Sequence, residues 1–459
     1  MSDFDSLAHR DVANQIHPYT NLAQHQESGP LIIERGNGIR VVDSAGRAYI
    51  EAMSGLWSVG LGFSEQRLVD AATRQFQKLP YYHSFSHKAH SPSIELASRL
   101  VGLTPDNLNH VHFTNSGSEA NDAAIKIVWY VNNALGRSAK KKIIARKQGY
   151  HGATIASGSL TGIPSIHQDF DLPAIPVRHI TCPYYYRHAH PGETEADFSR
   201  RLALELEELI LSEGADTIAA FIGEPLIAAG GVIPAPEGYW QEIQRVCKRY
   251  DVLVIADEII TGFGRLGVMF GADYYGIQPD IMVLSKQLTS SYQPLAAILV
   301  SSEINEVLVN QSARLGSFVH GFTTTGHPVA TAVALENIKI IEERGLVENA
   351  RVVGSKLQAE LRHLSDHPLV GDVRGAGLVA GVELVADKVS KKQFDRAGEL
   401  GAYIFRRAHD YGLIIRAIGD TIAFCPPLIS TQADIDQILS AFEHTLRDAT
   451  SWANAQGLH

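Results

Sequence analysis

The 459-residue sequence has few cysteines. Cys182, Cys247 and Cys425 are the only three, and no two of them stand in a CxxC spacing. This number and spacing indicate neither a disulfide framework nor a cysteine zinc site. A reducing compartment fits such a sequence, so we expect a cytoplasmic protein.

The sequence also has no excess of basic residues. It contains 40 lysines and arginines and 50 aspartates and glutamates, which give a net charge of −10. Nucleic acids and anionic membranes select for basic patches, so we expect neither as a partner. An apolar stretch at 217–236 is broken by Glu224, Pro225 and glycines, and the first ten residues lack the pattern of a secretion signal. The expected partners are therefore small molecules.

Short apolar runs alternate with helical patterns through the middle of the chain. Three runs, at 217–222, 281–284 and 296–300, together with one that ends at Asp257, have the length and composition of buried strands. Between them, apolar residues fall on single helical faces. Strands separated by helices imply crossover connections, so the sequence predicts an α/β fold with a mainly parallel sheet covered on both faces.

The length of the chain predicts more than one lobe, because a single core stops growing below this size. From about residue 326 the pattern changes to a helix that stops at Gly345 and strand-like runs at 378–384 and 413–416. Hairpin-like runs at 39–43 and 48–51 belong to the N-terminal segment. We expect a large domain over 61–325 and a smaller α+β domain built from both termini, 1–60 and 326–459.

One lysine and one aspartate stand at the ends of two predicted strands. Lys286 follows the run 281–284 and enters a polar, turn-rich segment, and Asp257 ends the run 251–257. Ligands of parallel sheets bind beyond the carboxyl ends of the strands. Pyridoxal phosphate (PLP) needs an amine for its aldehyde and an anion for its ring nitrogen. The pair therefore suggests a PLP site in which Lys286 and Asp257 are the catalytic residues.

A candidate phosphate site lies where an expected strand runs through a glycine turn into a helix. Ser116, Gly117 and Ser118 stand at the start of that helix. The first N–H groups of a helix have no internal acceptor, and the helix dipole favours an anion there. An ordinary N-cap with a capping box is the alternative, but the presence of Asp257 and Lys286 favours phosphate.

With these residues the chain resembles the class III aminotransferases of the fold-type I PLP enzymes, in the branch of the omega-amino acid:pyruvate and amine:pyruvate transaminases. The resemblance covers nearly the whole chain. Its most specific segments are Asn-Ser-Gly-Ser-Glu-Ala-Asn-Asp at 115–122, Gly-Tyr-His-Gly at 149–152, Gly-Glu-Pro at 223–225, Ala-Asp-Glu-Ile-Ile-Thr-Gly-Phe-Gly-Arg at 256–265, Lys286, and His-Gly-Phe-Thr at 320–323.

The resemblance implies a seven-stranded, mainly parallel sheet in the large domain. It also implies an aminotransferase (EC 2.6.1.-) that moves an amino group from a primary amine or omega-amino acid to pyruvate, giving alanine. The reaction would be ping-pong and pass through pyridoxamine phosphate. A homodimer with shared active sites, or a tetramer, is implied as well.

The resemblance also assigns roles around the cofactor. Lys286 would form the Schiff base and shuttle the proton, and Asp257 would pair with the ring nitrogen. Tyr150 and Ile259 would pack on the two faces of the ring, and Thr323 of a neighbouring subunit would add a phosphate contact. The full set of expected cofactor-binding residues is Ser116, Gly117, Ser118, Tyr150, His151, Glu224, Asp257, Ile259, Lys286 and Thr323.

Arg416 matches the mobile arginine of amine:pyruvate transaminases, and a planar guanidinium suits two-point binding of pyruvate's carboxylate. A salt bridge between Arg416 and Asp420 is the alternative. By the same resemblance, the substrate-binding residues are Tyr19, Leu56, Trp57, Phe85, Tyr150, Ala229 and Arg416. The sequence leaves the amine open among β-alanine, taurine, 4-aminobutyrate, putrescine and arylalkylamines.

Other functions fit parts of the sequence less well. The glycines at 262–267 satisfy a dinucleotide-binding pattern and would suggest an NAD-dependent oxidoreductase, but glycines and a proline interrupt the helix that should follow. A PLP-dependent aminomutase shares the lysine and aspartate, whereas a catalytically silent PLP-binding protein would not need both. His83, His87 and His90 would suggest a metal site, but His87 and His90 have no carboxylate at useful spacing and surface histidines are the ordinary explanation, so no metal site is predicted.

Overall fold

A seven-stranded sheet forms the centre of the protein, whose computed structural model describes residues 6–458. Strands β5 to β9 run parallel, while β10 is antiparallel to both of its neighbours, β9 and β4. The mainly parallel fold is therefore confirmed. The strand order is β4 (Leu108–Thr114), β10 (Ala296–Ser301), β9 (Ile281–Leu284), β8 (Leu253–Asp257), β7 (Ile218–Gly223), β5 (Lys142–Arg146) and β6 (Val177–Ile180).

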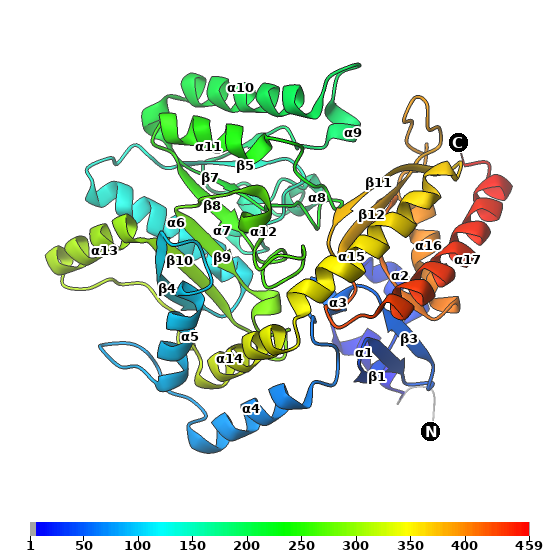
Figure 1. Cartoon of the computed structure of the whole chain (residues 1–459), viewed down its shortest axis with the longest axis horizontal. Coiled ribbons are helices and arrows are strands. Elements are labelled where there is room, and N and C mark those ends of the chain that lie inside the picture. The colour runs from blue at the N-terminus through cyan, green and yellow to red at the C-terminus, as the bar shows by residue number, and fades with distance from the viewer. Residues whose placement is uncertain (1–5, 459) are drawn as a thin grey trace.

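Helices cover both faces of this sheet because alternate strand residues point to opposite sides. Ile144 of β5 packs in the core that contains the long helices α10 (Glu195–Glu213) and α11 (Tyr239–Arg249). Ile143 of the same strand belongs to the core on the other face. That core contains residues of α6 (Gly117–Ala134), α7 (Ile155–Leu160) and α13 (Ser302–Leu315). Figure 1 shows α10 and α11 together along one edge of the molecule.

Two four-stranded sheets lie beside the large sheet. The first joins the N-terminal strands β1 (Ile33–Asn37), β2 (Arg40–Asp43) and β3 (Ala48–Glu51) to β13 (Leu413–Ile414). The second contains β11 (Val370–Ala376), β12 (Val379–Leu384), β15 (Thr421–Phe424) and β14 (Arg416–Ile418). Both ends of the chain therefore meet in one region (Figure 1), and we propose to treat residues 1–60 and 326–459 as one small domain.

The remaining helices complete these two parts. Helix α14 packs against α4 and α5 beside the large sheet, and α15 continues toward the smaller sheets. None of the helices within residues 6–458 is long and apolar enough to cross a membrane. The bounds are α1 (Leu7–Asn14), α2 (Leu22–Ser28), α3 (Ser54–Trp57), α4 (Gln66–Lys78), α5 (Ser91–Val101), α8 (Pro164–His167), α9 (Tyr185–His188), α12 (Gly271–Tyr275), α14 (Pro328–Glu343), α15 (Leu346–His363), α16 (Glu399–Asp410) and α17 (Gln432–Gln456).

One sequence expectation differs in detail from the structure. The run 413–416 is predicted as one strand-like run, but it divides between two sheets: β13 pairs with β3, and β14 pairs with β15. Ile415, which is 1% exposed, separates the two pieces. The glycines at 262–267 lie in turns and are followed by only the five-residue helix α12, so the long helix that a dinucleotide site requires does not follow them.

Candidate active site

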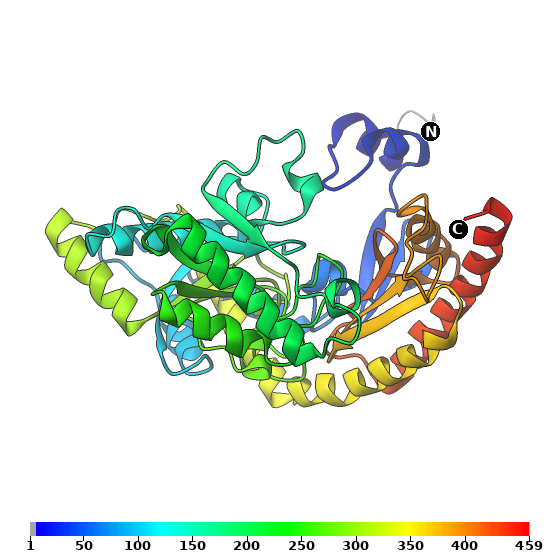
Figure 2. The same ribbon diagram turned by 90° about the horizontal axis from the view of Figure 1, so that it is seen from above.

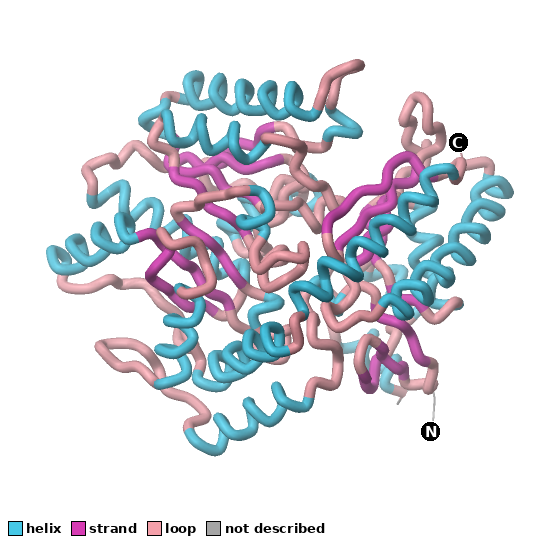
Figure 3. The backbone as a smooth tube through the Cα atoms, in the orientation of Figure 1, coloured by secondary structure: helices cyan, strands magenta, loops and turns pink. Residues whose placement is uncertain are grey.

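A cavity of about 930 Å³ lies beyond the carboxyl ends of three parallel strands. Glu224, Asp257 and Lys286, which stand at or just after the ends of β7, β8 and β9, all line it. Residues from both ends of the sequence, including Trp57 and Arg416, also line it. Figure 3 shows the loops that gather in this central region between the large sheet and the smaller sheets. The sequence prediction that a site forms at these strand ends therefore agrees with the geometry.

The Asp257 carboxylate is 2% exposed and is held by three donors. Its Oδ2 accepts hydrogen bonds from His151 Nδ1 at 2.8 Å and from Asn121 Nδ2 at 2.9 Å. Its Oδ1 accepts from the N–H of Ile259 at 3.2 Å. His151 Nε2 is buried without a partner among the described residues. A carboxylate fixed in this way is suited to pair with a cationic ring nitrogen facing the cavity.

Lys286 stands in a strained turn directly after β9. Its φ is +46°, a left-handed value that is uncommon for residues other than glycine. Behind it, Asn337 Nδ2 donates to the backbone oxygen of Gln287 at 2.7 Å, and Ser290 Oγ donates to Asn337 Oδ1 at 2.7 Å. Burial lowers the pKa of Lys286 to about 8, although Asp257 and Glu224 act in the opposite direction. The amine is thus closer to its neutral, nucleophilic form than an exposed lysine.

The N-terminus of α6 offers free donors to the same cavity. Gly117 and Ser118 line it, and their backbone N–H groups find no acceptor within residues 6–458. A side chain on Gly117 would place its Cβ 2.6 Å from Ile259 Cδ1, so a larger residue there would displace the end of the Ile259 side chain. Ser116 does not line the cavity, and its hydroxyl instead caps the helix by accepting from the N–H of Glu119 at 3.2 Å. The free N–H groups of Gly117 and Ser118 at the start of α6 are the features of an anion site.

Tyr150 and Glu224 lie on the adjoining wall. The Glu224 carboxylate accepts from the N–H of Tyr150 at 3.0 Å and from the N–H of Ala228 at 3.1 Å. Burial raises the pKa of Glu224, while the nearby His151 acts to lower it. Glu224 therefore fixes the backbone that carries Tyr150, and it also fixes the turn that carries Ala229, another cavity residue.

Arg416 is the main charged group on the substrate side. It lines the cavity, and within the described residues no carboxylate forms an ion pair with it. Asp420, the alternative partner, instead accepts from the N–H groups of Gly398 and Gly401 at 2.7 and 3.0 Å. Burial lowers the pKa of Arg416, and Tyr150 acts against this effect. A half-buried guanidinium without an anion is suited to bind a carboxylate from a substrate.

The apolar side of the cavity includes three of the other expected substrate residues. Tyr19 reaches across to Tyr150, and their hydroxyl oxygens lie 3.1 Å apart. Leu56 and Trp57 come from the irregular turn of α3, where Gly55 has φ +64° and Trp57 has φ +64°. Trp57 is 2% exposed, whereas Leu56 is 57% exposed.

Phe85 and Thr323 lie elsewhere. Neither lines the cavity of its own chain. Thr323 is exposed and its backbone oxygen accepts from the Tyr81 hydroxyl at 2.7 Å. Phe85 is 43% exposed and lies against Gly321, where an added Cβ would be 3.3 Å from its ring. The two residues thus lie in one surface region, and within a single chain the structure separates them from Lys286.

Some cavity residues were missed by sequence reasoning. Asn121 holds Asp257 from α6, and Gly152, Ser285 and Ile418 line the cavity. Ser285 directly precedes Lys286 in the sequence, whereas only the fold brings Asn121, Gly152 and Ile418 to this site.

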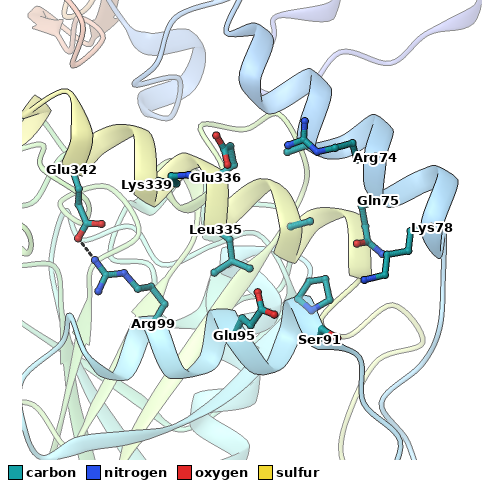
Figure 4. A pocket seen from close by; sticks show the side chains of 13 residues that line it. Arg74, Gln75, Lys78, Ser91, Glu95, Arg99, Leu335, Glu336, Lys339 and Glu342 are labelled. Carbon is teal, nitrogen blue, oxygen red and sulfur yellow. Dashed lines mark hydrogen bonds and ion pairs between the residues drawn. The ribbon is translucent and has the colours of Figure 1, made fainter.

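A second hollow of about 540 Å³ lies between α4, α5 and α14 (Figure 4). It shares no lining residue with the first cavity. Acidic and basic side chains mix along its walls, and Arg99 pairs with Glu342 across one end. It holds no nucleophile paired with a base, so it offers no comparable chemistry.

The sequence matches the family model described as "Aminotransferase class-III" over residues 22–446. The chain belongs to the class III aminotransferases. It is 50% identical over 432 residues to the mitochondrial gamma aminobutyrate transaminase 1 of Solanum lycopersicum, covering 94% of this chain and 84% of that protein. The rice relatives that match include mitochondrial gamma-aminobutyrate transaminase 1 of Oryza sativa subsp. japonica, at 48% identity over 431 residues, covering 94% of this chain and 84% of that protein.

Solved omega transaminases share the fold of this class III aminotransferase. The omega transaminase of Pseudomonas jessenii in complex with PMP has a TM-score of 0.97 and 58% identity, covering 98% of this chain and 99% of that one. A thermostable omega transaminase engineered for synthesis of bulky amines has a TM-score of 0.97 and 59% identity, covering 97% of this chain and 100% of that chain. Fold-type I architecture and aminotransferase activity are thereby confirmed.

Class III aminotransferases use PLP, and the residues of this cavity fit that cofactor. The amine of Lys286 suits an aldehyde, the buried Asp257 carboxylate suits a ring nitrogen, and the open N–H groups of Gly117 and Ser118 suit a phosphate. The expectation of PLP is confirmed, while the role of each residue remains a proposal.

Proposed function

We propose that this aminotransferase moves the amino group of a primary amine or omega-amino acid to pyruvate, giving alanine, in two ping-pong half-reactions. Arg416 is the observation that supports pyruvate as the amino acceptor, because it is an unpaired guanidinium in the same cavity as Lys286. Pyruvate offers a carboxylate beside a small carbonyl group, and arginine binds carboxylates at two points. The omega transaminases that share the fold support the choice of donor class.

Each proposed residue has a task that its position supports. Bound PLP supplies an electron-withdrawing ring that stabilises negative charge on the substrate carbon. Asp257 would keep the ring nitrogen protonated, because a buried carboxylate favours a nearby cation. Lys286 Nζ would hold the aldehyde and would serve as the group that takes and returns the proton of the substrate carbon. Tyr150 and Ile259 position the ring from their places on the cavity wall.

Apolar residues form the part of the cavity that would bind the amine donor. Leu56, Trp57 and Ala229 line the same cavity as Arg416, and the small Ala229 leaves room for a large substituent. We infer that an uncharged arylalkylamine fits when Arg416 turns away. 4-Aminobutyrate is the second candidate donor, because the curated relatives are gamma aminobutyrate transaminases and Arg416 suits its carboxylate. A PLP-dependent aminomutase is disfavoured, because it would not need an acceptor-binding arginine.

We further propose a homodimer, alone or within a tetramer, in which Phe85 and Thr323 complete the partner's cavity. Both residues are exposed, and apolar side chains nearby are exposed as well: Tyr81 by 40%, Tyr82 by 42% and Val319 by 87%. Such a surface supports association between subunits. Sedimentation should therefore give at least a dimer, and a fully active monomer would exclude shared sites. Residence in the cytoplasm stays a prediction.

The test of the proposed function is a donor panel. Holoenzyme is incubated with pyruvate and, separately, β-alanine, taurine, 4-aminobutyrate, putrescine or 1-phenylethylamine, and alanine is quantified. Parallel reactions use 2-oxoglutarate as the competing acceptor. Alanine formation that exceeds glutamate formation supports pyruvate as the acceptor, whereas the opposite ratio would assign another acceptor. Rearranged donor without any acceptor would indicate an aminomutase.

A further inference from the structure

A cluster of three metal-ligating side chains lies in the N-terminal segment, outside the cavity. His17 Nε2 and His25 Nε2 lie 2.9 and 3.0 Å from the same oxygen, Oδ2 of Asp11. The candidate ligand atoms of the three residues lie within 4.8 Å of one another. The two imidazole rings are 4.2 Å apart between centroids. Their side chains are 18%, 25% and 10% exposed for Asp11, His17 and His25.

This cluster joins the parts of a weakly packed segment. Asp11 belongs to α1, His25 belongs to α2, and His17 lies in the connection between them. Neither helix contains a fully buried residue. Figure 2 shows the two helices, in dark blue, standing at one edge of the molecule beside the N-terminus. A link between the two helices would therefore be a main source of conformational stability for this segment.

The same connection reaches the active site. Pro18 and Tyr19, which follow His17 directly, line the cavity, and the Tyr19 hydroxyl contacts Tyr150. Tyr19 is 68% exposed and has φ +52°, so it is held mainly from its ends rather than by packing. Whatever fixes His17 also fixes the position of Tyr19 across the cavity.

We propose that Asp11, His17 and His25 form a binding site for a divalent transition metal of the zinc type, and that the bound ion fixes Tyr19 over the cavity. Two imidazoles and one carboxylate are a recurrent ligand set for zinc, with a fourth position left to water. Zinc bonds of about 2.0–2.2 Å place ligand atoms roughly 3.3 Å apart in a tetrahedron. The two separations between a histidine Nε2 and Asp11 Oδ2, 2.9 and 3.0 Å, are close to this value, and two of the three groups retain solvent access for the ion.

The alternative is that the three side chains only form hydrogen bonds. Glutamine separates the two cases, because its amide N–H donates to Asp11 as the imidazole N–H does, while glutamine is a poor zinc ligand. The double variant His17→Gln/His25→Gln therefore keeps the fold of the segment and loses the metal site. His190→Ala removes an exposed histidine far along the chain and is the matched control.

The experiment titrates zinc chloride into tag-free holoenzyme, freed of metal beforehand, by calorimetry in a non-chelating buffer. We expect one equivalent per chain for the wild type and for His190→Ala. The glutamine variant should lose at least about tenfold in affinity, the lower end of the loss seen for altered metal surroundings. A wild type that binds no zinc, or a glutamine variant that binds it equally well, would overturn the proposal.

Hydrogen exchange of the same samples tests the consequence for Tyr19. Zinc should slow amide exchange in peptides that span residues 7–28 of the wild type and leave the glutamine variant unchanged. Unchanged exchange in a wild type that binds one zinc would overturn the coupling to Tyr19. Neither readout depends on transamination, so their failure and the failure of the proposed function are distinguishable.

Discussion

Replacement of Arg416 by alanine should separate two classes of donor. The guanidinium lines the cavity, has no ion-pair partner among the described residues and is partly removed from water by burial. Hydrogen bonds that involve a charged group contribute about 1.5–3 kcal/mol. Since about 1.4 kcal/mol corresponds to a factor of ten, the half-reaction with alanine or pyruvate should weaken roughly ten- to a hundredfold in kcat/KM.

The assay is a single-turnover measurement of the cofactor spectrum. Alanine is compared with 1-phenylethylamine, a donor that offers the guanidinium no carboxylate. Arg416→Lys keeps the charge but loses the planar fork, so it should recover only part of the alanine reaction. Equal losses with both donors in Arg416→Ala would show that the residue is structural. No loss with alanine would mean that another group binds the carboxylate.

Three further predictions concern the cofactor site. Asp257→Asn should still bind PLP but transaminate about a hundredfold more slowly, because ~3 kcal/mol of stabilisation of the ring cation is lost. Steady-state turnover near that of the wild type would show that Asp257 has no part in the mechanism. The rate at which PLP attaches to the apoenzyme should rise with pH and level off above about 8, the pKa to which burial lowers Lys286, because only the neutral amine attacks. Stopped-flow traces that still steepen tenfold per pH unit near pH 10 would contradict that pKa. Ser118→Ala should weaken PLP binding about tenfold or more by equilibrium dialysis, since one charge-assisted hydrogen bond is lost. Ser116→Ala, in contrast, should lower only the melting temperature, because its hydroxyl caps α6 outside the cavity; equal PLP affinities of the two variants would refute this distinction.

Lys286 and Asp257 could be located from sequence because parallel strands place their carboxyl ends at one edge of the sheet. The run 281–284 matches β9 to the residue, and Asp257 ends β8 as expected. The antiparallel direction of β10 was not visible, since apolar runs do not encode strand direction. Likewise, the sequence does not show that β13 and β14 separate at Ile415.

Side chains that meet only through the fold were beyond the reach of sequence patterns. Asn121 approaches Asp257 across 136 positions, and Asp420 caps α16 rather than pairing with Arg416. Binding of the cofactor by Ser116 stays a prediction, and its hydroxyl caps the helix, a contact that the sequence pattern also offered as an ordinary N-cap. The contribution of Thr323 depends on a second subunit, which the pattern of one chain does not describe.

The central claim is that the protein moves an amino group from an amine to pyruvate, with Lys286 as the nucleophile and proton carrier. Its most direct test incubates the holoenzyme with a ¹⁵N-labelled amine donor and pyruvate and measures ¹⁵N in alanine by mass spectrometry. The account predicts labelled alanine from the wild type and almost none from Lys286→Ala, because nucleophile and proton carrier are removed together. Unlabelled alanine from the wild type, or labelled alanine at the same rate from Lys286→Ala, would contradict the account.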